Sequence, residues 1–357
     1  MSTYKTIEWL DGVVRMLDQR LIPNQISYQD YTHYEDVANA IQTMVIRGAP
    51  AIGAAAAYGL ALAAINSSTG DPPSLRKELE RAARVLNAAR PTAANLKWAL
   101  ERVLSSLEDP TLVTVAAIKN RVLAEAQAIA AEDVQANRQI GLNALPLIPH
   151  KARIVHHCNT GALATVDYGT ALGVIRSAHE HGREVHVYVD ETRPRLQGAR
   201  LTTWELGQLG IPYTLIVDGA SGYFMHQVGV DLCLVGCDRV AANGDTANKV
   251  GTYNLSLVAH AHRVPFYVAG PTSTIDLSLP SGDQIEIEQR DPEEVLVING
   301  ERIAPAEAQA ANPAFDITPA RYITAIITEK GIAYPPFNAS LSELVLAGKA
   351  GSRQSAT

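Results

Sequence analysis

The pattern of apolar and polar residues changes character along this chain, and its first part alternates. Over residues 6–23, "TIEWLDGVVRMLDQRLIP", apolar and polar side chains exchange places on both sides of Asp11-Gly12. Alternation with a period of two predicts strands, and an Asp-Gly pair between two strands favours a tight hairpin turn. We therefore expect the chain to begin with a small β element.

From about Tyr34 to Leu145 the apolar residues recur every three or four positions, with charged residues between them. The clearest stretches cover residues 74–89, 93–107 and 112–145. This spacing is typical of amphipathic helices, and Pro91 and Pro110 should interrupt them. The pattern predicts an N-terminal domain over residues 1–145, made of the β element followed by helices.

One uncharged run in this region, "GAPAIGAAAAYGLALAAI" from Gly48, is long enough to suggest a membrane span. Alanine and glycine dominate it, however, and few strongly apolar side chains are present to favour lipid. A buried helix that packs closely through small residues explains the composition better. We predict no membrane association.

Short apolar runs alternate with helical stretches after residue 145. The runs cover residues 153–158, 184–191, 213–219, 231–238 and 265–270. Strands that alternate with helices predict an α/β fold with a parallel sheet covered on both faces, here over residues 146–345. The remaining residues, 346–357, "LAGKAGSRQSAT", are expected to form a flexible tail.

Polar residues stand where these predicted strands end. They are Cys158, Asp190 with Glu191, Asp218 and Asp238. Ligands of open parallel sheets bind beyond the carboxyl ends of the strands, so this edge is the expected location of a site.

Composition narrows the possible functions. The 357 residues are 47% hydrophobic and 19% charged, which is typical of a globular protein of two domains. The net charge of −7 argues against a general nucleic-acid binder, so a few local cations would have to hold any anionic ligand. Three cysteines and no secretion signal at the N-terminus predict a reducing cytoplasm.

The stretch "HHCNTGALAT", residues 156–165, leaves the role of Cys158 open. Small residues follow the cysteine where a strand turns toward a helix, so backbone N–H groups there could face an anion or lower the pKa of the thiol. Metal binding is not predicted. Cys233 and Cys237 lack a second ligand pair at zinc-site spacing, and His156 and His157 should point to opposite faces of a strand. A purely structural cysteine is the remaining alternative.

Three other segments carry candidate ligand contacts. The polar loop "DETRPRLQGARLT" follows a strand and includes Gln197. The segment "GCDRVAANGDTANKVGTYN" combines Asp238 with Asn248 and Lys249 at an expected helix start, which suits a phosphate although no Walker spacing is present. In the helical domain, Arg47 precedes Gly-Ala-Pro and Arg90 precedes Pro-Thr.

Together these motifs resemble one enzyme family. "IRGAPAIG", "RPTAANL", "HCNTGALAT", "DETRPRLQGARLTTWEL", "VGCDRVAANGDTANKVGTYNL" and "PFYVAGPTSTID" occur in the order found in methylthioribose-1-phosphate isomerases of methionine salvage. That family is related in fold to the regulatory subunits of the eukaryotic translation-initiation guanine-nucleotide exchange factor. The resemblance extends from the opening β element to about Phe337.

The resemblance implies a Rossmann-like α/β domain, a homodimer, a small sugar-phosphate substrate and neither a metal nor an organic cofactor. It implies catalytic roles for Cys158 and Asp238. The substrate-binding positions that it implies are Arg47, Gly48, Ala49, Arg90, Gln197, Asn248 and Lys249.

The implied reaction converts 5-methylthioribose 1-phosphate to 5-methylthioribulose 1-phosphate. Phosphate on the anomeric oxygen prevents spontaneous ring opening, so Asp238 would protonate the ring oxygen. Cys158 would then either transfer a proton or only stabilise a direct hydride shift. The alternatives are an isomerase of 5-deoxyribose 1-phosphate or ribose 1,5-bisphosphate, and a non-catalytic sugar-phosphate or nucleotide sensor.

Overall fold

The computed structural model describes residues 4–354, and it describes side-chain environments through residue 346. The chain forms two compact units. Unit 1 comprises residues up to Ala136 together with Gly161–Gly169, and unit 2 comprises Asn137–Thr160 and the chain from Thr170 onward. The boundary therefore lies before the expected residue 145, because helix α5 (Val115–Ala144) continues from one unit into the other. The return of 161–169 to unit 1 was not predicted.

Unit 1 begins with the expected β element. Strands β1 (Ile7–Leu10) and β2 (Val13–Leu17) pair antiparallel, and Leu10 lies opposite Val13 across the Asp11-Gly12 turn. Both turn residues have positive φ, 44° and 90°, as a two-residue hairpin turn requires. A third strand, β3 (Tyr28–Tyr31), pairs with β2 and was not predicted.

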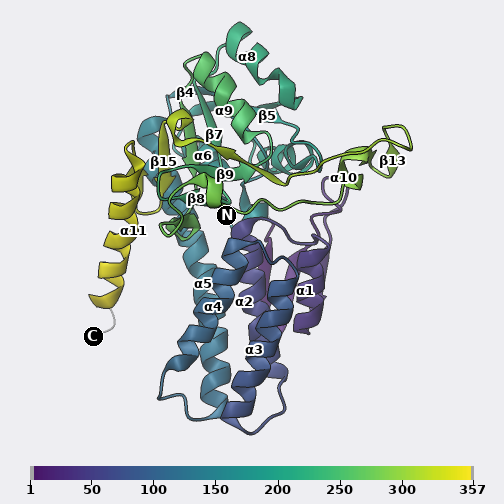
Figure 1. The fold of residues 1–357 in the computed structure, drawn as a ribbon, viewed down its shortest axis with the longest axis vertical. Helices are drawn as coiled ribbons and strands as arrows, with labels where there is room; N and C mark the ends of the chain where they lie inside the picture. Colours follow the sequence, from purple (N-terminus) through teal and green to yellow (C-terminus); the bar gives the residue numbers. More distant parts are fainter. Residues whose placement is uncertain (1–3, 355–357) are drawn as a thin grey trace. The chain divides into compact units, whose positions relative to one another are not determined.

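Helices form the rest of unit 1, as the spacing of apolar residues predicted (Figure 1). They are α1 (Tyr34–Gln42), α2 (Ala49–Asn66), α3 (Pro72–Ala88), α4 (Ala94–Ser105) and the first part of α5. Pro91 lies between α3 and α4, and Pro110 lies between α4 and α5. Both prolines therefore interrupt the helices where expected.

Helix α2 is the alanine-rich run that suggested a membrane span. Among the described residues it is the one helix with the length and hydropathy to cross a bilayer, but 72% of it is buried inside the protein. It contacts α1, α3 and α4, so it forms the centre of the helical core. Small side chains allow its neighbours to approach closely on all sides.

Unit 2 contains the predicted parallel sheet. Its strand order is β16-β15-β10-β7-β4-β5-β6, and only β16 runs antiparallel to its neighbour. The strands are β4 (Lys151–His156), β5 (Glu184–Asp190), β6 (Tyr213–Ile216), β7 (Leu232–Val235), β10 (Phe266–Ala269), β15 (Ala325–Thr328) and β16 (Gly331–Ala333). The sequence pattern located the first five of these.

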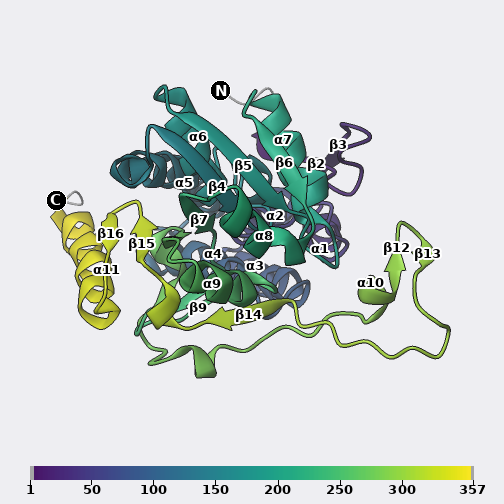
Figure 2. The same ribbon diagram turned by 90° about the horizontal axis from the view of Figure 1, so that it is seen from above.

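Helices cover both faces of this sheet (Figure 2). On one face the apolar core includes residues of the end of α5, of α6 (Ala171–Glu180) and of α7 (Thr203–Gln208). On the other it includes residues of α8 (Ser221–Gln227), α9 (Thr252–Ala261) and α11 (Phe337–Gln354). Burial on both faces explains why the strands read as continuous apolar runs.

The strand order reverses between β4 and β7. From β4 the chain adds β5 and β6 on one side, and it then returns to add β7, β10 and β15 on the other side. In open parallel sheets, ligands bind at the carboxyl ends of the strands where the order reverses, which here are β4 and β7.

Smaller elements complete unit 2. One short sheet contains β8 (Arg239–Ala241), β9 (Thr246–Lys249), β11 (Ile275–Asp276) and β14 (Phe315–Thr318). Helix α10 (Glu293–Leu296) precedes a hairpin of β12 (Val297–Ile298) and β13 (Glu301–Arg302). The flexible tail expected over 346–357 overlaps α11, which extends to Gln354 because Ala, Lys, Arg and Gln are good helix formers. Residues 355–357 lie outside the described part.

Candidate active site

Cys158 and Asp238 follow the two strands at which the sheet order reverses. Cys158 lies just beyond β4, which ends at His156, and Asp238 lies just beyond β7, which ends at Val235; these strands are hydrogen-bonded neighbours. The two residues that the sequence singled out as catalytic candidates therefore lie at the carboxyl ends of the strands where the order reverses, which is where a sheet of this kind binds its ligand.

Cys158 is held in an unusual backbone conformation. Its φ is 69°, in the left-handed region that a residue with a side chain adopts at a cost of about 1–2 kcal/mol. Its N–H donates to the Thr192 hydroxyl at 2.8 Å, and its carbonyl accepts from the Thr202 hydroxyl at 2.7 Å. The residue is 7% exposed. Such local strain, maintained by specific hydrogen bonds, is characteristic of functional positions.

The loop after β5 supplies those two threonines and Gln197. The Asp218 carboxylate, just beyond β6, accepts the backbone N–H groups of Thr192 at 2.6 Å and Arg193 at 2.7 Å. Gln197 on this loop is buried, and its Oε1 has no hydrogen-bond partner among the described residues. A buried amide oxygen without a donor is costly unless a ligand supplies one, which fits the predicted binding role of Gln197.

Asn248 and Lys249 lie on strand β9 rather than at the helix start that the sequence suggested. The preceding turn joins β8 and β9 into a hairpin, and helix α9 begins only at Thr252, after Gly251 with a φ of 103°. The hairpin also fixes Asp238, whose N–H donates to the Ala247 carbonyl at 2.9 Å. Asp238 and Asn248 are thus carried by one small β element.

Lys249 approaches its neighbours on β14. Its Nζ donates to the Ala314 carbonyl at 2.6 Å and lies 4.5 Å from the centre of the Phe315 ring. The side chain of Asn248 donates to the Thr252 hydroxyl at 2.9 Å. These contacts give the ammonium a defined position instead of leaving it in solvent.

Arg47, Gly48, Ala49 and Arg90 belong to unit 1. Arg47 Nε donates to the Gln19 side chain at 3.1 Å, and Gln19 in turn donates to the Leu163 carbonyl at 2.7 Å. Ala49 begins α2, and Arg90 follows α3. A Cβ on Gly48 would lie 2.4 Å from the Ala164 carbonyl oxygen, so no other residue fits there. The segment 161–169, which follows Cys158 in sequence, therefore packs directly on the Arg47-Gly48 motif.

The other two cysteines do not share the position of Cys158. Cys233 is fully buried in the core of β7, and burial raises the pKa of its thiol well above the ordinary value. Burial raises the pKa of Cys237 to about 12. Both thiols therefore remain protonated at neutral pH. All three cysteines are free.

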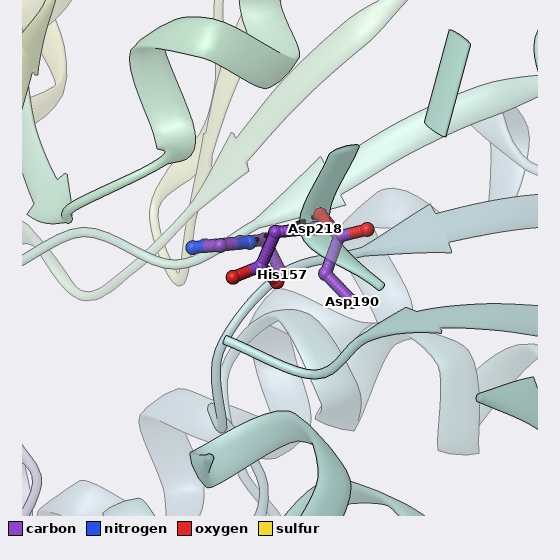
Figure 3. Close-up of side chains that lie close together, drawn as sticks. All are labelled: His157, Asp190 and Asp218. Carbon is purple, nitrogen blue, oxygen red and sulfur yellow. Dashed lines mark hydrogen bonds and ion pairs between the residues drawn. The ribbon is translucent and has the colours of Figure 1, made fainter. Parts of the chain in front are cut away.

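His157, Asp190 and Asp218 form a cluster that the sequence did not predict (Figure 3). One ligand-capable atom of each lies within 4.8 Å of the others. His157 Nδ1 lies 3.0 Å from Asp190 Oδ2 and its Nε2 lies 2.9 Å from the Val250 carbonyl, while Asp218 accepts the two backbone N–H groups of the β5 loop. Hydrogen bonds within the protein thus account for the cluster. The signal in the sequence was an acidic residue at the end of each neighbouring strand.

Comparison with known proteins identifies the family to which the chain belongs. Residues 45–335 match the initiation factor 2 subunit family. A methylthioribose-1-phosphate isomerase from Synechococcus sp. is 58% identical over 346 residues, which cover 97% of this chain and 99% of that protein. The chain belongs to the methylthioribose-1-phosphate isomerase family. A second isomerase of that name, from Pseudothermotoga lettingae, is 53% identical over 96% of this chain and 99% of its own length.

Solved structures agree with this family assignment. The 5-methylthioribose 1-phosphate isomerase of Pyrococcus horikoshii OT3 superimposes with a TM-score of 0.91 at 44% identity, covering 97% of both chains. A chain from A. fulgidus described as translation initiation factor eIF-2B subunit delta gives a TM-score of 0.85 at 41% identity, covering 96% of this chain and 100% of its own. The isomerase family and the initiation-factor subunits therefore share this α/β fold, as the sequence motifs implied.

Proposed function

We propose that this chain isomerises 5-methylthioribose 1-phosphate to 5-methylthioribulose 1-phosphate, with Cys158 and Asp238 as the catalytic residues. The observation that carries the proposal is their placement. Both follow the strands at which the sheet order reverses, and Cys158 is held in a strained backbone conformation there. The names of the relatives support the same reaction.

Asp238 acts as the general acid in this proposal. It protonates the ring oxygen of the furanose, and the bond between that oxygen and C1 opens. Hydrogen moves from C2 to C1, and the C2 hydroxyl becomes a ketone as its proton returns to the carboxylate. The strand that leads to Asp238, "LCLV", is fully buried, so the carboxyl group emerges from an apolar part of the sheet.

Cys158 acts at the carbon atoms between which hydrogen moves. As a thiolate it removes the C2 proton and returns it to C1, or it stabilises the electron-deficient carbon during a hydride shift. Isomerisation in heavy water separates the routes, because deuterium at C1 requires proton abstraction by a group that exchanges with solvent.

The remaining predicted residues bind the substrate. Lys249 supplies charge for the phosphate, and Gln197 presents an unpartnered buried amide oxygen that a sugar hydroxyl can satisfy. Roles for Arg47, Gly48, Ala49, Arg90 and Asn248 follow from the family motifs that contain them. No metal or organic cofactor takes part in the proposed reaction.

The catalytic assignment is tested by substitution. Cys158→Ala and Asp238→Asn should each lower kcat by at least about 100-fold, within the range that acid–base groups contribute, while circular dichroism stays unchanged. Cys233→Ala is the matched control, because it removes a thiol from the core of β7 and should leave kcat near wild type. Turnover close to wild type in either site variant contradicts the assignment.

Two alternatives are compared in the same assay. 5-Deoxyribose 1-phosphate and ribose 1,5-bisphosphate replace the methylthio group by hydrogen and by phosphate, so relative kcat/KM values identify the group at C5. The A. fulgidus relative bears the name of a translation-factor subunit, and a purely regulatory role for this chain predicts no turnover of any of the three sugars.

We further propose that the chain forms a homodimer through the free edge of the large sheet. Strand β6 is the edge strand of the large sheet. Apolar side chains are exposed on β6, just after it and on helix α8, which follows it. The exposed fractions are 40% for Tyr213, 47% for Leu215, 60% for Val217 and 64% for Tyr223. An apolar sheet edge of this kind is unusual in a monomer, since it invites association.

A further inference from the structure

A buried histidine beside Cys158 connects the segments that carry the proposed chemistry. His157 is 1% exposed and follows the last residue of β4. One ring nitrogen contacts the carboxylate of Asp190, at the end of β5, and the other contacts the carbonyl of Val250, directly after Lys249. The ring thus bridges peptides adjacent to the proposed catalytic cysteine and to the proposed phosphate-binding lysine.

The hydrogen-bond partners fix where the protons are. A carbonyl oxygen can only accept, so Nε2 of His157 must carry a hydrogen that it donates to Val250. The contact between Nδ1 and Asp190 Oδ2, at 3.0 Å, then requires one further proton between the two groups. With Asp190 ionised, His157 is an imidazolium that donates at both nitrogens. Asp190 Oδ1 also accepts from the Ser221 hydroxyl at 3.0 Å, which favours the ionised carboxylate.

The surrounding charges retain that proton. Burial alone would lower the pKa of His157, but its hydrogen bond with Asp190 and the negative charges of Asp190 and Asp218 raise it above the ordinary value. Burial also raises the pKa of Asp190, so the pair as a whole holds its single proton firmly. The other described titratable groups that interact electrostatically with members of this cluster are His156, Glu191, Cys233 and Asp316.

The backbone at Val250 and Gly251, which accepts the hydrogen bond from His157, is also hydrogen-bonded on its other side. The N–H groups of Val250 and Gly251 donate to the Ala314 carbonyl at 3.1 Å and to Asp316 at 2.7 Å, both on or beside β14. A Cβ on Gly251 would lie 2.8 Å from Cε1 of His157, so the ring packs directly against the backbone. The position of the Lys249 peptide is therefore set between β14 and the imidazole.

We propose that His157 is a positioning residue for the isomerisation: clamped by Asp190, its ring holds the Lys249–Gly251 backbone at a fixed distance from Cys158. This inference rests on the proposed function, because it assigns no chemistry to His157 itself. A displacement of about 1 Å between a binding group and a reacting group costs roughly 100-fold in rate, so a rigid link between them matters.

The neighbouring histidine provides a matched control. His156 is also fully buried, but its Nδ1 donates to the Leu234 carbonyl within the sheet and its Nε2 lies 3.3 Å from the Thr160 hydroxyl. Burial lowers the pKa of His156 to about 4, so its ring is neutral at pH 7. The two adjacent histidines therefore differ in charge and in the segments that they join.

The kinetic test compares three variants with wild type. His157→Leu should lower kcat/KM by about 100-fold and raise KM, whereas His157→Gln, whose amide can still donate to Val250, should recover activity to within about 10-fold of wild type. His156→Leu should lower stability and leave kcat/KM of the folded protein near wild type. Equal losses in His156→Leu and His157→Leu, or no rescue by glutamine, would overturn the proposal.

The pH profile gives a readout that a purely structural role would not change. Because the pKa of His157 is raised above the ordinary value, the ring keeps its second proton to higher pH than an ordinary histidine does, and kcat/KM should fall as pH rises through that pKa. Glutamine does not titrate, so this alkaline fall should be absent in His157→Gln. In Asp190→Asn the ring loses its counter-charge, and the fall should move to lower pH. An unchanged profile in both variants contradicts the proposal.

Imidazole ¹⁵N spectra separate failure of this inference from failure of the proposed function. At pH 7.5, two protonated ring nitrogens are expected for His157 and one for His156, with signals assigned through the glutamine and leucine variants. If the wild-type protein turns over none of the three sugars, the proposed function is wrong. A neutral His157 ring in the spectra would refute the clamp even in an active enzyme.

Discussion

At the scale of single residues, Gly198 shows how closely the candidate site is packed. A Cβ at this position would lie 1.7 Å from the carbonyl oxygen of Asp190 and 2.9 Å from its carbonyl carbon. Backbone atoms cannot move aside as the end of a flexible side chain can. The glycine therefore allows the loop that carries Gln197 to lie directly against the end of β5.

Replacement of Gly198 by alanine should consequently be destabilising. We expect Gly198→Ala to lower the free energy of unfolding in urea by about 1–3 kcal/mol, the usual cost of overpacking. Gly207→Ala is the control, because a Cβ there meets no atom within 4 Å and lies in α7, where alanine should raise stability by about 0.5–1 kcal/mol. A neutral effect of Gly198→Ala would show that the loop does not need this close approach.

Residues that end strands could be predicted, and residues that act through distant partners could not. Cys158 and Asp238 are found from the sequence because each follows an apolar run. The clamp at His157 is different, since its partners lie 33 and 93 residues away along the chain. No local pattern indicates which of two adjacent buried histidines becomes charged, because that depends on the carboxylate that the fold brings to it.

At the scale of elements, the loop after β5 is linked to a projecting arm, residues 285–314, that contains α10 and the β12–β13 hairpin (Figure 2). Arg193 donates to the Val295 carbonyl at 2.8 Å, and Arg195 pairs with Glu294 at 2.7 Å. Glu294 also pairs with Arg290 at 2.6 Å. A single carboxylate thus joins two arginines, one on the arm and one on the loop that carries Gln197.

Acid should release this connection. Burial would raise the pKa of Glu294, but the hydrogen bonds from Arg290 and Arg195 lower it to about 2. Its contribution is therefore complete above about pH 4.5 and is lost as pH falls toward 2. Cleavage of the arm by pepsin should increase over this interval in wild type, and Glu294→Gln should be cleaved readily throughout it.

Glu293→Gln is the control for that experiment, because Glu293 pairs with Arg302 on the exposed side of the arm and does not contact the loop. It should retain the wild-type pattern. If Glu294→Gln resists pepsin as well as wild type does, the arm is held by other contacts.

Element types were predicted well where the periodicity was long, and poorly where strands were short. Helices α2 to α5 and the strands β4, β5, β6, β7 and β10 follow from apolar spacing. Strands β8 and β9 were not predicted, and Asn248 and Lys249 were expected at a helix start instead. Both strands are short, and the polar residues of β9 form a strand because they pair with β8 and with β14. Residues 315–318, which form β14, lie far along the chain, so only the folded sheet reveals the pairing.

At the scale of the whole molecule, the proposed dimer should depend on β6. Leu215→Lys places a charge on the exposed sheet edge, and we expect light scattering after size-exclusion chromatography to show a shift from dimer to monomer mass at micromolar concentration. Val113→Lys is the control, since Val113 is 72% exposed and belongs to unit 1 rather than to the large sheet. A dimer that survives Leu215→Lys would locate the interface elsewhere.

The segment 161–169 has a consequence for how such a protein could have arisen. Ala162 and Leu163 accept hydrogen bonds from Thr6 and Gln19, and the N–H of Val166 donates to Asp133, so nine residues embedded in the α/β half complete the folding of the other half. A fragment that ended at residue 145 would lack them and would leave Gly48 uncovered. The two halves are therefore not modules joined end to end. Recombination at residue 145 would separate residues 161–169 from Thr6, Gln19 and Asp133, to which they are hydrogen-bonded.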